Sequence, residues 1–300
     1  MFLLIDAHAL IYRSFHALPK TLISPQGQLT NAAYGFTRVL LSTINEFQPQ
    51  YLAVAFDHKD KTNRKAEYQE YKANRVEMPE ELKPQIDLCK QVVRAMNIPL
   101  FEKSGFEADD LIGTISRILN KNKSTLTMIV SGDKDLFQLV DGNTHVFIPA
   151  RGKFSQDKEY DREAVIKKMG ITPEQVVDLK ALMGDASDNI PGVAGIGPKT
   201  AVSLLKSYQN LAGVYQALAE ERISGAVAKK LTKDKEQAFL SQKLATIDVQ
   251  VEIDFDLEKS VVTDYDKTKV VELFDNLGFK SLVKNLPADK FESQLQEALF

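Results

Sequence analysis

Three short apolar runs, each followed by aspartate, constrain the fold of this chain more than any other feature. The runs are residues 1–5, 51–56 and 126–130, and they lead into Asp6, Asp57, and the pair Asp133 and Asp135. The segments between them show helical periodicity, and buried strands that alternate with helices are typical of a parallel sheet covered on both faces. Because the carboxyl ends of parallel strands share one edge, where ligands bind, we expect these aspartates to converge.

A group of acids also opens the helix predicted after residue 106. Glu107, Asp109 and Asp110 lie within four residues, directly before an apolar helical pattern that continues to Leu119. Acids in a first turn suit the positive end of the helix dipole, which by itself explains one or two of them. If the alternation of strands and helices holds, this helix begins at the same sheet edge as the aspartates.

Composition excludes several classes of protein. The 300 residues are 44% hydrophobic with a formal net charge of -3, which leaves room for two modest domains. One cysteine, Cys89, excludes an intramolecular disulfide and a cysteine zinc site, and the four histidines lack ligand spacing. The N-terminal apolar run is too short to span a membrane and has no basic leader, so we expect a cytoplasmic protein that does not use a membrane.

The number of acids in the predicted centre points to metal ions. The nine acids are Asp6, Asp57, Glu107, Asp109, Asp110, Asp133, Asp135, Asp185 and Asp188. Clustered carboxylates repel one another unless cations balance them, and oxygen ligands without thiols or imidazoles select Mg²⁺ or Mn²⁺. Nine acids suffice for two ions, which about 4 Å apart can activate a water and stabilise the leaving oxygen of a phosphodiester. The alternative, a solvated acidic rim, is disfavoured by the shared sheet edge.

A glycine-rich segment between two predicted helices forms a second candidate site. It contains Gly192, Gly195, Gly197, Lys199 and Thr200. Glycines permit close backbone approach, a proline suits the first position of a helix, and a helix N-terminus offers free amides to phosphate. We interpret the segment as a helix-hairpin-helix clamp that holds duplex backbone without reading base sequence; the alternative is a plain glycine-rich turn.

A basic stretch follows Asp57 directly. Residues 58–75 carry six lysines and arginines against three acids, with Tyr68 and Tyr71 among them. Cations beside aromatic rings suit a single-stranded backbone with bases to stack upon. Such a stretch is more often a solvated surface, but its position after a predicted metal ligand favours a role with nucleic acid.

Helical patterns and breakers divide the chain near residues 160–170. Helices are predicted at 7–15, 31–46, 79–96, 173–183 and 266–277, and residues 249–256 look extended. The expected division is an α/β part at 1–165 with an arch at about 58–95, and a helical part at 166–300. The helical part contains the hairpin at about 185–206 and a tail that packs back on the core.

Six motifs are together very specific. They are TNAAYGF at 30–36, AVAFD at 53–57, YKANR at 71–75, EADD at 107–110, GDKD at 132–135 and LMGDASDNIPG at 182–192. With these motifs, almost the whole chain resembles the 5′-nuclease domains of bacterial DNA polymerases I, in the flap endonuclease family. The resemblance implies an α/β fold of PIN-like nuclease type, with a mostly parallel central sheet flanked by helices, a helical arch and a C-terminal helix-hairpin-helix region.

The resemblance also implies roles for individual residues. Asp6, Asp57, Glu107 and Asp109 match the family's first metal group; Asp133, Asp135, Asp185 and Asp188 match the second, with Asp110 as a supporting acid. Lys72 and Arg75 match a catalytic basic pair on the arch through which the free 5′ strand passes. The implied DNA contacts are Tyr12, which stacks on a base near the scissile bond, Asn31, Arg38, Arg64, Tyr71, Gly192, Gly195, Gly197, Lys199 and Thr200.

The implied function is a structure-specific 5′-nuclease, both 5′-3′ exonuclease and flap endonuclease, that serves DNA replication and repair. It would use two Mg²⁺ ions, or Mn²⁺ in their place, with K⁺ at the hairpin. The expected substrates are branched or nicked duplex DNA with a 5′ flap or 5′ end, and RNA–DNA during primer removal. We expect a nucleoid-associated, cytoplasmic monomer that works with a DNA polymerase in cis or in trans.

Two positions depart from the family pattern, and three other hypotheses remain open. The first motif reads Asp6-Ala7-His8-Ala9 where a glycine and serines are usual, and Asn63 stands where relatives carry an aromatic residue. A catalytically silent DNA-binding module is disfavoured by the complete set of acids. A phosphatase of the DxD type needs an acid at the position of His8, and a small RNase-type nuclease would have no use for the glycine-rich hairpin.

Overall fold

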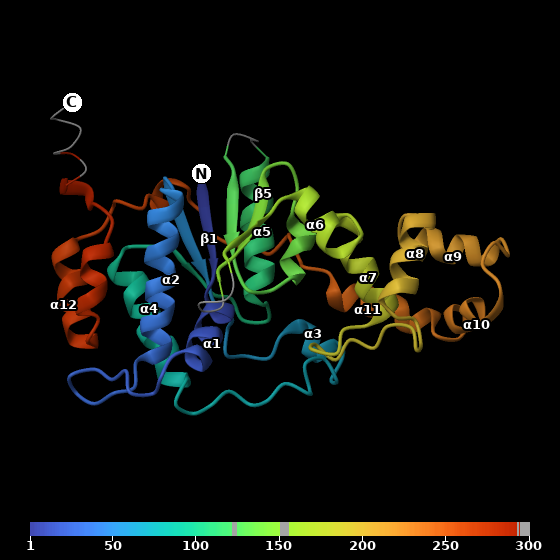
Figure 1. The fold of residues 1–300 in the computed structure, drawn as a ribbon, viewed down its shortest axis with the longest axis horizontal. Coiled ribbons are helices and arrows are strands. Elements are labelled where there is room, and N and C mark those ends of the chain that lie inside the picture. The colour runs from blue at the N-terminus through green and yellow to red at the C-terminus, as the bar shows by residue number, and fades with distance from the viewer. Residues whose placement is uncertain (122–124, 151–155, 293, 295–300) are drawn as a thin grey trace.

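A six-stranded sheet forms the centre of the larger lobe, in the computed structural model that describes residues 1–121, 125–150, 156–292 and 294 (Figure 1). The strands are β1 (Phe2–Asp6), β2 (Tyr51–Ala55), β3 (Leu100–Phe101), β4 (Thr127–Val130), β5 (Thr144–Ile148) and β6 (Lys158–Tyr160). Their order is β3-β2-β1-β4-β5-β6, and every neighbouring pair is parallel except β5 and β6. The predicted α/β fold with a mostly parallel sheet is confirmed.

Helices cover both faces of the sheet, as the continuous burial of its strands requires. On β1, Leu3 and Ile5 pack into one apolar cluster, while Phe2 and Leu4 pack into another on the opposite face. The first face carries α1 (Ala7–Ala17), α2 (Asn31–Phe47), α4 (Lys83–Ala95) and α12 (Lys267–Leu277). The second carries α5 (Ala108–Asn120) and α6 (Arg162–Met169), on the other side of the sheet in Figure 1.

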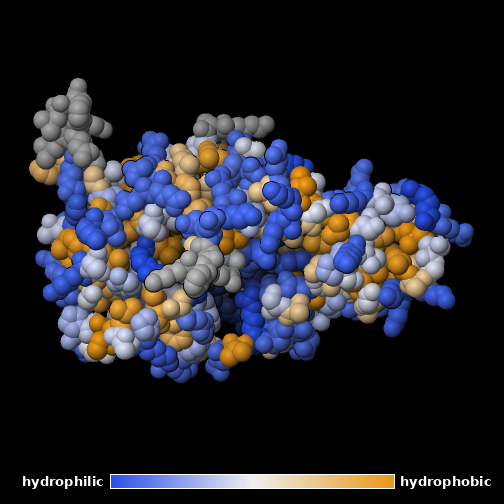
Figure 2. All heavy atoms as spheres, in the orientation of Figure 1, coloured by the Kyte–Doolittle hydropathy of each residue, from blue (hydrophilic) through white to orange (hydrophobic). Residues whose placement is uncertain are grey.

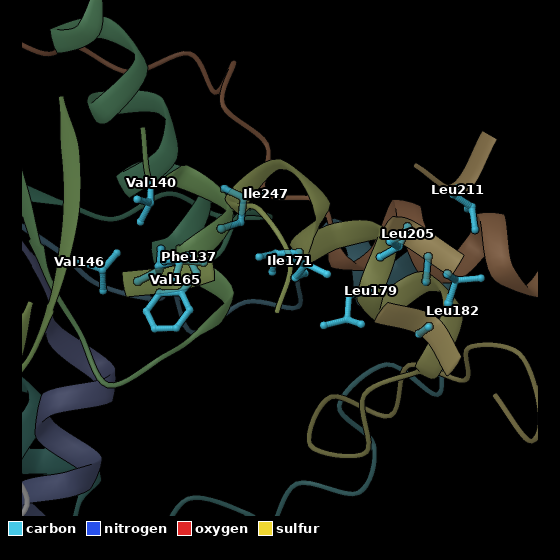
Figure 3. Packing of buried hydrophobic residues seen from close by; sticks show 14 of the residues in the cluster. Phe137, Val140, Val146, Val165, Ile171, Leu179, Leu182, Leu205, Leu211 and Ile247 are labelled. Atoms are coloured by element: carbon cyan, nitrogen blue, oxygen red, sulfur yellow. The ribbon is translucent and has the colours of Figure 1, made fainter. Parts of the chain in front are cut away.

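A smaller lobe of helices projects from the β5 and β6 side of the sheet (Figure 1). Its helices are α7 (Val176–Met183), α8 (Pro198–Tyr208), α9 (Leu211–Ala219), α10 (Gly225–Lys233) and α11 (Lys235–Ala245). Figure 3 shows how its apolar side chains continue the core of the larger lobe, from Phe137 and Val165 through Ile171 to Leu179 and Leu205. The two lobes therefore share one hydrophobic core, which fixes the hairpin relative to the sheet edge.

Several elements differ from the expectation. The helix predicted at 79–96 begins at Lys83 and packs on the sheet with α2 and β3, so it covers the core and is no part of an arch. Between residues 58 and 82 the structure has one short helix, α3 (Asn63–Glu67). Strands β5 and β6 were not predicted. Residues 249–256 lie outside the sheet, and the ring of Phe255 packs at a tilt against those of Phe2 and Phe101 instead.

No helix within the described residues is both long enough and apolar enough to cross a membrane.

Candidate active site

The predicted acids converge at the carboxyl edge of the sheet. Asp6 is the last residue of β1 and lies opposite Ala55 of β2, while Ile5 lies opposite Val130 of β4. Strand order reverses at β1, with β2 on one side and β4 on the other, and such a reversal is where open α/β sheets bind ligands. The sequence runs on from these strands directly into Asp57 and into the loop that holds Asp133.

A cavity of about 950 Å³ opens at this edge. Five of the nine predicted acids line it: Asp6, Asp57, Glu107, Asp109 and Asp133. The predicted cations Lys72 and Arg75 line it too, as does the half-buried ring of Tyr12. Figure 2 shows a recess between hydrophilic residues on this face, between the positions of α1 and α3 in Figure 1. Acids from four segments far apart in the sequence thus face cations across one space.

Local turns hold the acids in place. The carboxylate of Asp6 caps α1 by accepting from the N–H of Ala9 at 3.2 Å, and its other oxygen accepts from Ser131 Oγ at 2.6 Å. Ser131 Oγ in turn accepts from the N–H of Asp133 at 2.9 Å. One side chain therefore ties the end of β1 to the loop after β4.

Asp57 is fixed from two sides. Its Oδ1 accepts from the N–H of Ala108 at 2.7 Å, which joins it to the first turn of α5. Its own N–H donates to Nδ1 of His8 at 3.0 Å, and burial lowers the pKa of that imidazole, so the neutral acceptor form is favoured. His8, which departs from the family pattern, thus positions the backbone of a predicted ligand.

Burial and mutual repulsion act against ionisation of these acids. Burial raises the pKa of Asp6 to about 7, since repulsion from Asp57 and Asp133 adds to it and the hydrogen bond from Ser131 only partly offsets it. Burial also raises the pKa of Asp109 well above its usual value, helped by Asp133 and Asp6. Such a cluster is stabilised by any cation placed among its oxygens.

The remaining acids are paired with basic side chains. Glu107 Oε1 accepts from Lys72 Nζ at 2.7 Å, and Asp188 Oδ1 accepts from Arg75 at 2.5 Å. Lys180, on α7, donates to both Asp135 and Asp185. The pKa values of the Asp135 and Asp185 carboxyls shift in opposite directions. Burial and Asp133 raise the pKa of Asp135 to about 6 despite Lys180, whereas at Asp185 the bonds from Lys180 and Ser187 outweigh burial and lower the pKa to about 2.

The donor set fits hard divalent cations, although the side chains do not close around one. The cavity offers carboxylate oxygens and no thiol, which is the chemistry that Mg²⁺ and Mn²⁺ prefer. Its two imidazoles, His8 and His58, each accept a backbone N–H at Nδ1. As the side chains stand, no three His, Cys, Asp or Glu residues in the described part of the chain converge closely enough to hold an ion. The pairs with Lys72, Arg75 and Lys180 direct four of the acids to ammonium and guanidinium groups instead.

A clasp of hydrogen bonds brings the segment that carries Lys72 against the loop after α7. The N–H of Lys72 donates to the carbonyl of Asp188 at 2.8 Å, Asn74 Nδ2 to that of Ala186 at 2.6 Å, and Asn189 Nδ2 to that of Glu70 at 2.7 Å. We call residues 70–75 and 185–189 together the clasp. The clasp places the second group of predicted acids next to the first.

Asp110 and Arg64 form a buried ion pair outside the cavity, which fits the supporting role predicted for Asp110 and not that of a direct metal ligand. Asp110 is 1% exposed and does not line the cavity. Its oxygens accept from Arg64 at 2.6 and 2.8 Å and from the N–H groups of Glu107 and Asp248, which leaves no oxygen directed at an ion. Arg64 also donates to the carbonyl of Thr246 at 2.6 Å, so its guanidinium is committed inside the protein, which argues against its predicted contact with DNA.

Two other predicted DNA contacts are buried. Tyr71 is 3% exposed, and its hydroxyl donates to Glu107 at 3.2 Å. Asn31 is fully buried and donates to the carbonyls of Phe15 and Leu18. Both side chains are therefore internal supports, and the predicted contacts are wrong. Arg38 is exposed on α2 outside the cavity, and its contact with DNA stays a prediction.

The glycine-rich hairpin has an inner and an outer part. Gly192 is buried with φ +63°, and a Cβ there would lie 2.1 Å from the backbone nitrogen of Gly184, so this glycine has a structural role. Its burial argues against the predicted contact with DNA. Gly195 is exposed at φ +77°, and Gly197 is the N-cap of α8. Lys199 is exposed in the first turn, with Thr200 beside it half-buried. The outer part presents the start of a helix to solvent, as a phosphate clamp requires.

Three side chains of the site were missed from the sequence. Ser131 and His8 act through hydrogen bonds between distant segments, for which the sequence carries no signal. Lys180 had one: it is a lone cation within the otherwise apolar second half of α7, one turn before Asp185. A charged residue in such a run is expected to have a buried partner.

A carboxylate-lined cavity at the carboxyl edge of a parallel sheet, beside basic side chains and a glycine-rich hairpin, defines a nuclease. Comparison with known families places the chain within that class. The family model described as 5′-3′ exonuclease, N-terminal resolvase-like domain, matches residues 1–170, and the model described as 5′-3′ exonuclease, C-terminal SAM fold, matches residues 171–268. The chain belongs to the 5′-3′ exonuclease family, and the nuclease assignment made from its motifs is confirmed.

Relatives of known name agree with this assignment. DNA polymerase I of Caldicellulosiruptor bescii is 42% identical over 283 residues, which are 94% of this chain and 33% of that protein. DNA polymerase I of Bacillus caldotenax is 41% identical over 300 residues, 99% of this chain and 34% of that protein. The chain thus spans about a third of the length of these relatives.

Solved structures share the fold at lower identity. The T5 5′-exonuclease with bound zinc has a TM-score of 0.66 and 21% identity, covering 95% of this chain and 98% of that one. The catalytic core of Rad2 in complex with DNA substrate has a TM-score of 0.62 and 17% identity, covering 95% and 90%. Both likenesses extend over both lobes.

Proposed function

We propose that this chain is a structure-specific 5′-nuclease, a 5′-3′ exonuclease and flap endonuclease that hydrolyses phosphodiesters near 5′ ends, flaps and nicks. The observation that carries the proposal is the cavity, in which acids from the ends of β1 and β2, the start of α5 and the loop after β4 face Lys72 and Arg75. Anionic backbone attracted by the cations would be brought against carboxylates that need divalent counter-ions. The cellular role that follows is flap and RNA primer removal in DNA replication and repair.

Two Mg²⁺ ions, replaceable by Mn²⁺, fit the two groups of acids. Bound there, such ions supply an activated water and stabilise the leaving oxygen. Asp6, Asp57, Glu107 and Asp109 would hold the first, and Asp133, Asp135, Asp185 and Asp188 the second. The T5 5′-exonuclease, whose structure contains divalent metal ions, supports this proposal through its shared fold.

The residues of the chain have separate tasks around the scissile phosphate. Lys72 and Arg75 reach the cavity from residues 58–82, where they can leave Glu107 and Asp188 for phosphate oxygens once those acids bind metal. Tyr12 lines the same cavity from α1, and its ring can stack on the base beside the scissile bond.

Duplex binding falls to the smaller lobe. The exposed start of α8, with Gly195, Gly197, Lys199 and Thr200, suits backbone phosphates without reading bases, and K⁺ can join a hairpin carbonyl to a phosphate there. We therefore assign the chemistry to residues 1–165 and duplex binding to residues 166–300. Within the second range, residues 293 and 295–300 lie outside the described residues.

We also propose a cellular setting, which follows from the names of the relatives. Because the matching relatives are DNA polymerases I, a polymerase in cis or in trans would fill the gap that the nuclease leaves. Branched or nicked DNA, and RNA–DNA at primers, are the substrates, and we expect a cytoplasmic, nucleoid-associated monomer.

One assay tests the proposed function. A labelled 5′ flap, a nicked duplex and a single strand of the same sequence are each incubated with the chain, with Mg²⁺ or with EDTA. We expect cleavage near the junction of the flap and at the nick, little on the single strand, and none in EDTA. Tight flap binding without cleavage in Mg²⁺ would instead identify a silent DNA-binding module.

A further inference from the structure

Lys180 lies between two acids of the predicted second metal group. It projects from α7, and its ammonium donates to Asp185 at 2.5 Å and to Asp135 on the other side. The three side chains are shielded from solvent, with exposed fractions of 12% for Lys180, 18% for Asp135 and 17% for Asp185. A buried cation held by two carboxylates is a strong, specific contact rather than a loose surface pair.

The two acids are built to present oxygens to this ammonium. Asp135 is anchored by its N–H, which donates to Asp133 Oδ1 at 2.9 Å, and by its carbonyl, which accepts from Gln138 at 3.0 Å. Oδ1 of Asp185 accepts from the N–H of Ser187 at 2.8 Å, which turns Oδ2 toward Lys180. The backbone of Asp135 and the carboxylate of Asp185 are therefore held by bonds that do not involve the lysine.

The acids that line the cavity are only partly paired, because Glu107 binds Lys72 while other acids beside it have no partner cation within the described residues. In the part of the chain that the structure describes, Asp6, Asp109 and Asp133 form no ion pair, although all three line the cavity. Without metal, these three acids have no partner cation among the described residues, whereas Asp135 and Asp185 share one. An incoming divalent ion meets an open site in one case and an occupied one in the other.

We propose that Lys180 is an internal counter-ion that occupies the second metal position in the metal-free protein and sets how tightly the second divalent ion binds. This inference rests on the proposed two-ion site and adds a specificity-determining residue to it. Two carboxylates with one ammonium keep a net charge of -1, whereas the same two with a divalent ion are neutral. The exchange is therefore favourable, but the ion must first displace a paired and shielded lysine.

The competing explanation is structural. Lys180 also joins the loop after β4, in the larger lobe, to the loop after α7, in the smaller one, so it could serve only to hold the lobes together. The two explanations predict different changes in metal affinity when Lys180 is replaced. If Lys180 only holds the lobes together, its loss weakens metal binding or leaves it unchanged. If Lys180 competes with the ion, its loss strengthens metal binding.

The test is direct Mn²⁺ binding to the full chain without DNA, by electron paramagnetic resonance of the free ion, for wild type and Lys180→Met. We expect wild type to bind one ion tightly and one weakly. The variant should bind the weaker ion at least roughly tenfold more tightly, which corresponds to the lower end of the coupling energies found for close charge pairs. Thermal unfolding gives a second readout. The variant should melt lower than wild type in EDTA, where Asp135 and Asp185 lose their cation, and Mn²⁺ should raise its melting temperature by more.

Lys90→Met is the matched control. Lys90 is 13% exposed and is paired with one acid, Glu102, that is not a predicted ligand. Its loss should lower the melting temperature equally in EDTA and Mn²⁺ and leave both Mn²⁺ constants unchanged.

The outcomes separate this inference from the proposed function. Unchanged or weaker binding of the second ion in Lys180→Met would overturn the role of Lys180 while the two-ion site stands. One ion in wild type and two in the variant would support the role of Lys180 but remove the second ion from the proposed reaction. A wild-type chain that binds no Mn²⁺ would overturn both.

Discussion

Lys72 Nζ lies 2.7 Å from Oε1 of Glu107, so a predicted catalytic cation and a predicted metal ligand neutralise each other across the cavity. The backbone of Lys72 is held in the left-handed region at φ +54°, and its N–H is bound to the carbonyl of Asp188. Local strain of this kind persists where surrounding contacts fix it, here the clasp. The arrangement keeps the cation beside the acids that metal binding would engage.

Lys72→Ala should slow chemistry more than it weakens binding. The ammonium is placed to offset negative charge that develops at the scissile phosphate, an effect of about 3 kcal/mol or roughly a hundredfold in rate. Single-turnover cleavage of a flap and flap affinity in Ca²⁺ measure the two effects separately. Lys61→Ala, an exposed lysine of the same segment, is the control and should change neither. A variant that loses only affinity would make Lys72 a binding residue.

Arg64→Ala should destabilise the fold without a direct effect on DNA affinity. The change leaves the buried carboxylate of Asp110 without its cation, and breaking such a buried pair costs about 3–5 kcal/mol. Urea unfolding measures this loss, and flap binding is measured under conditions where the variant remains folded. Normal stability with lost affinity would restore the DNA contact first predicted from the sequence.

Arg64 also shows where sequence reasoning stops. The aspartates at strand ends converged as predicted, because chain order and the rules of parallel sheets fix which ends meet. The basic stretch contains the two cations that line the cavity, Lys72 and Arg75, but its composition could not separate them from Arg64, whose partner Asp110 is 46 positions away. The same residue types point into a cavity and support its wall, so residue type alone does not distinguish the two roles.

The fold, like the site, could be predicted from the sequence only in part. Helix and strand positions were predictable where apolar residues recur over several turns or fill a whole strand. Strand β6 has three residues, of which Tyr160 alone is buried, so it has too little periodicity to detect. Apolar and polar residues alternate at 249–256, as in a strand, but the apolar side chains pack on the core from outside the sheet. Alternation alone cannot show whether a segment pairs with a sheet.

Gly192→Ala should destabilise the hairpin far more than Gly195→Ala. At Gly192 the added Cβ meets rigid backbone at 2.1 Å, and we expect a loss above about 2 kcal/mol. At Gly195 it meets the flexible end of Lys230, so mainly the positive φ is penalised, about 1 kcal/mol. Urea unfolding of the two variants measures the difference. Equal losses would contradict the division of the hairpin into an inner and an outer part.

Lys199→Glu should weaken duplex binding for all sequences alike. A lysine at the start of α8 that contacts one phosphate contributes roughly one unit to the slope of log affinity against log salt, and the variant should lose it. Binding to a duplex at several KCl concentrations gives the slope. Lys206→Glu makes the same change at the other end of α8 and should leave the slope unaltered. A cleavage defect in Lys199→Glu that saturating enzyme does not rescue would place the hairpin in the catalytic machinery.

Single-turnover cleavage of a 5′ flap by Asp109→Asn tests the central claim most directly. The Asp109 carboxylate lines the cavity and makes no hydrogen bond or ion pair within the described residues, so the change removes charge without breaking a contact. The control, Asp87→Asn, alters an acid of the same cavity that is not a predicted ligand. With Mg²⁺ we predict a rate lower by two or more orders of magnitude for Asp109→Asn, a near-normal rate for Asp87→Asn, and unchanged or tighter flap binding in Ca²⁺ for both. A near-normal rate for Asp109→Asn at saturating Mg²⁺ would contradict a metal-dependent reaction at this edge of the sheet.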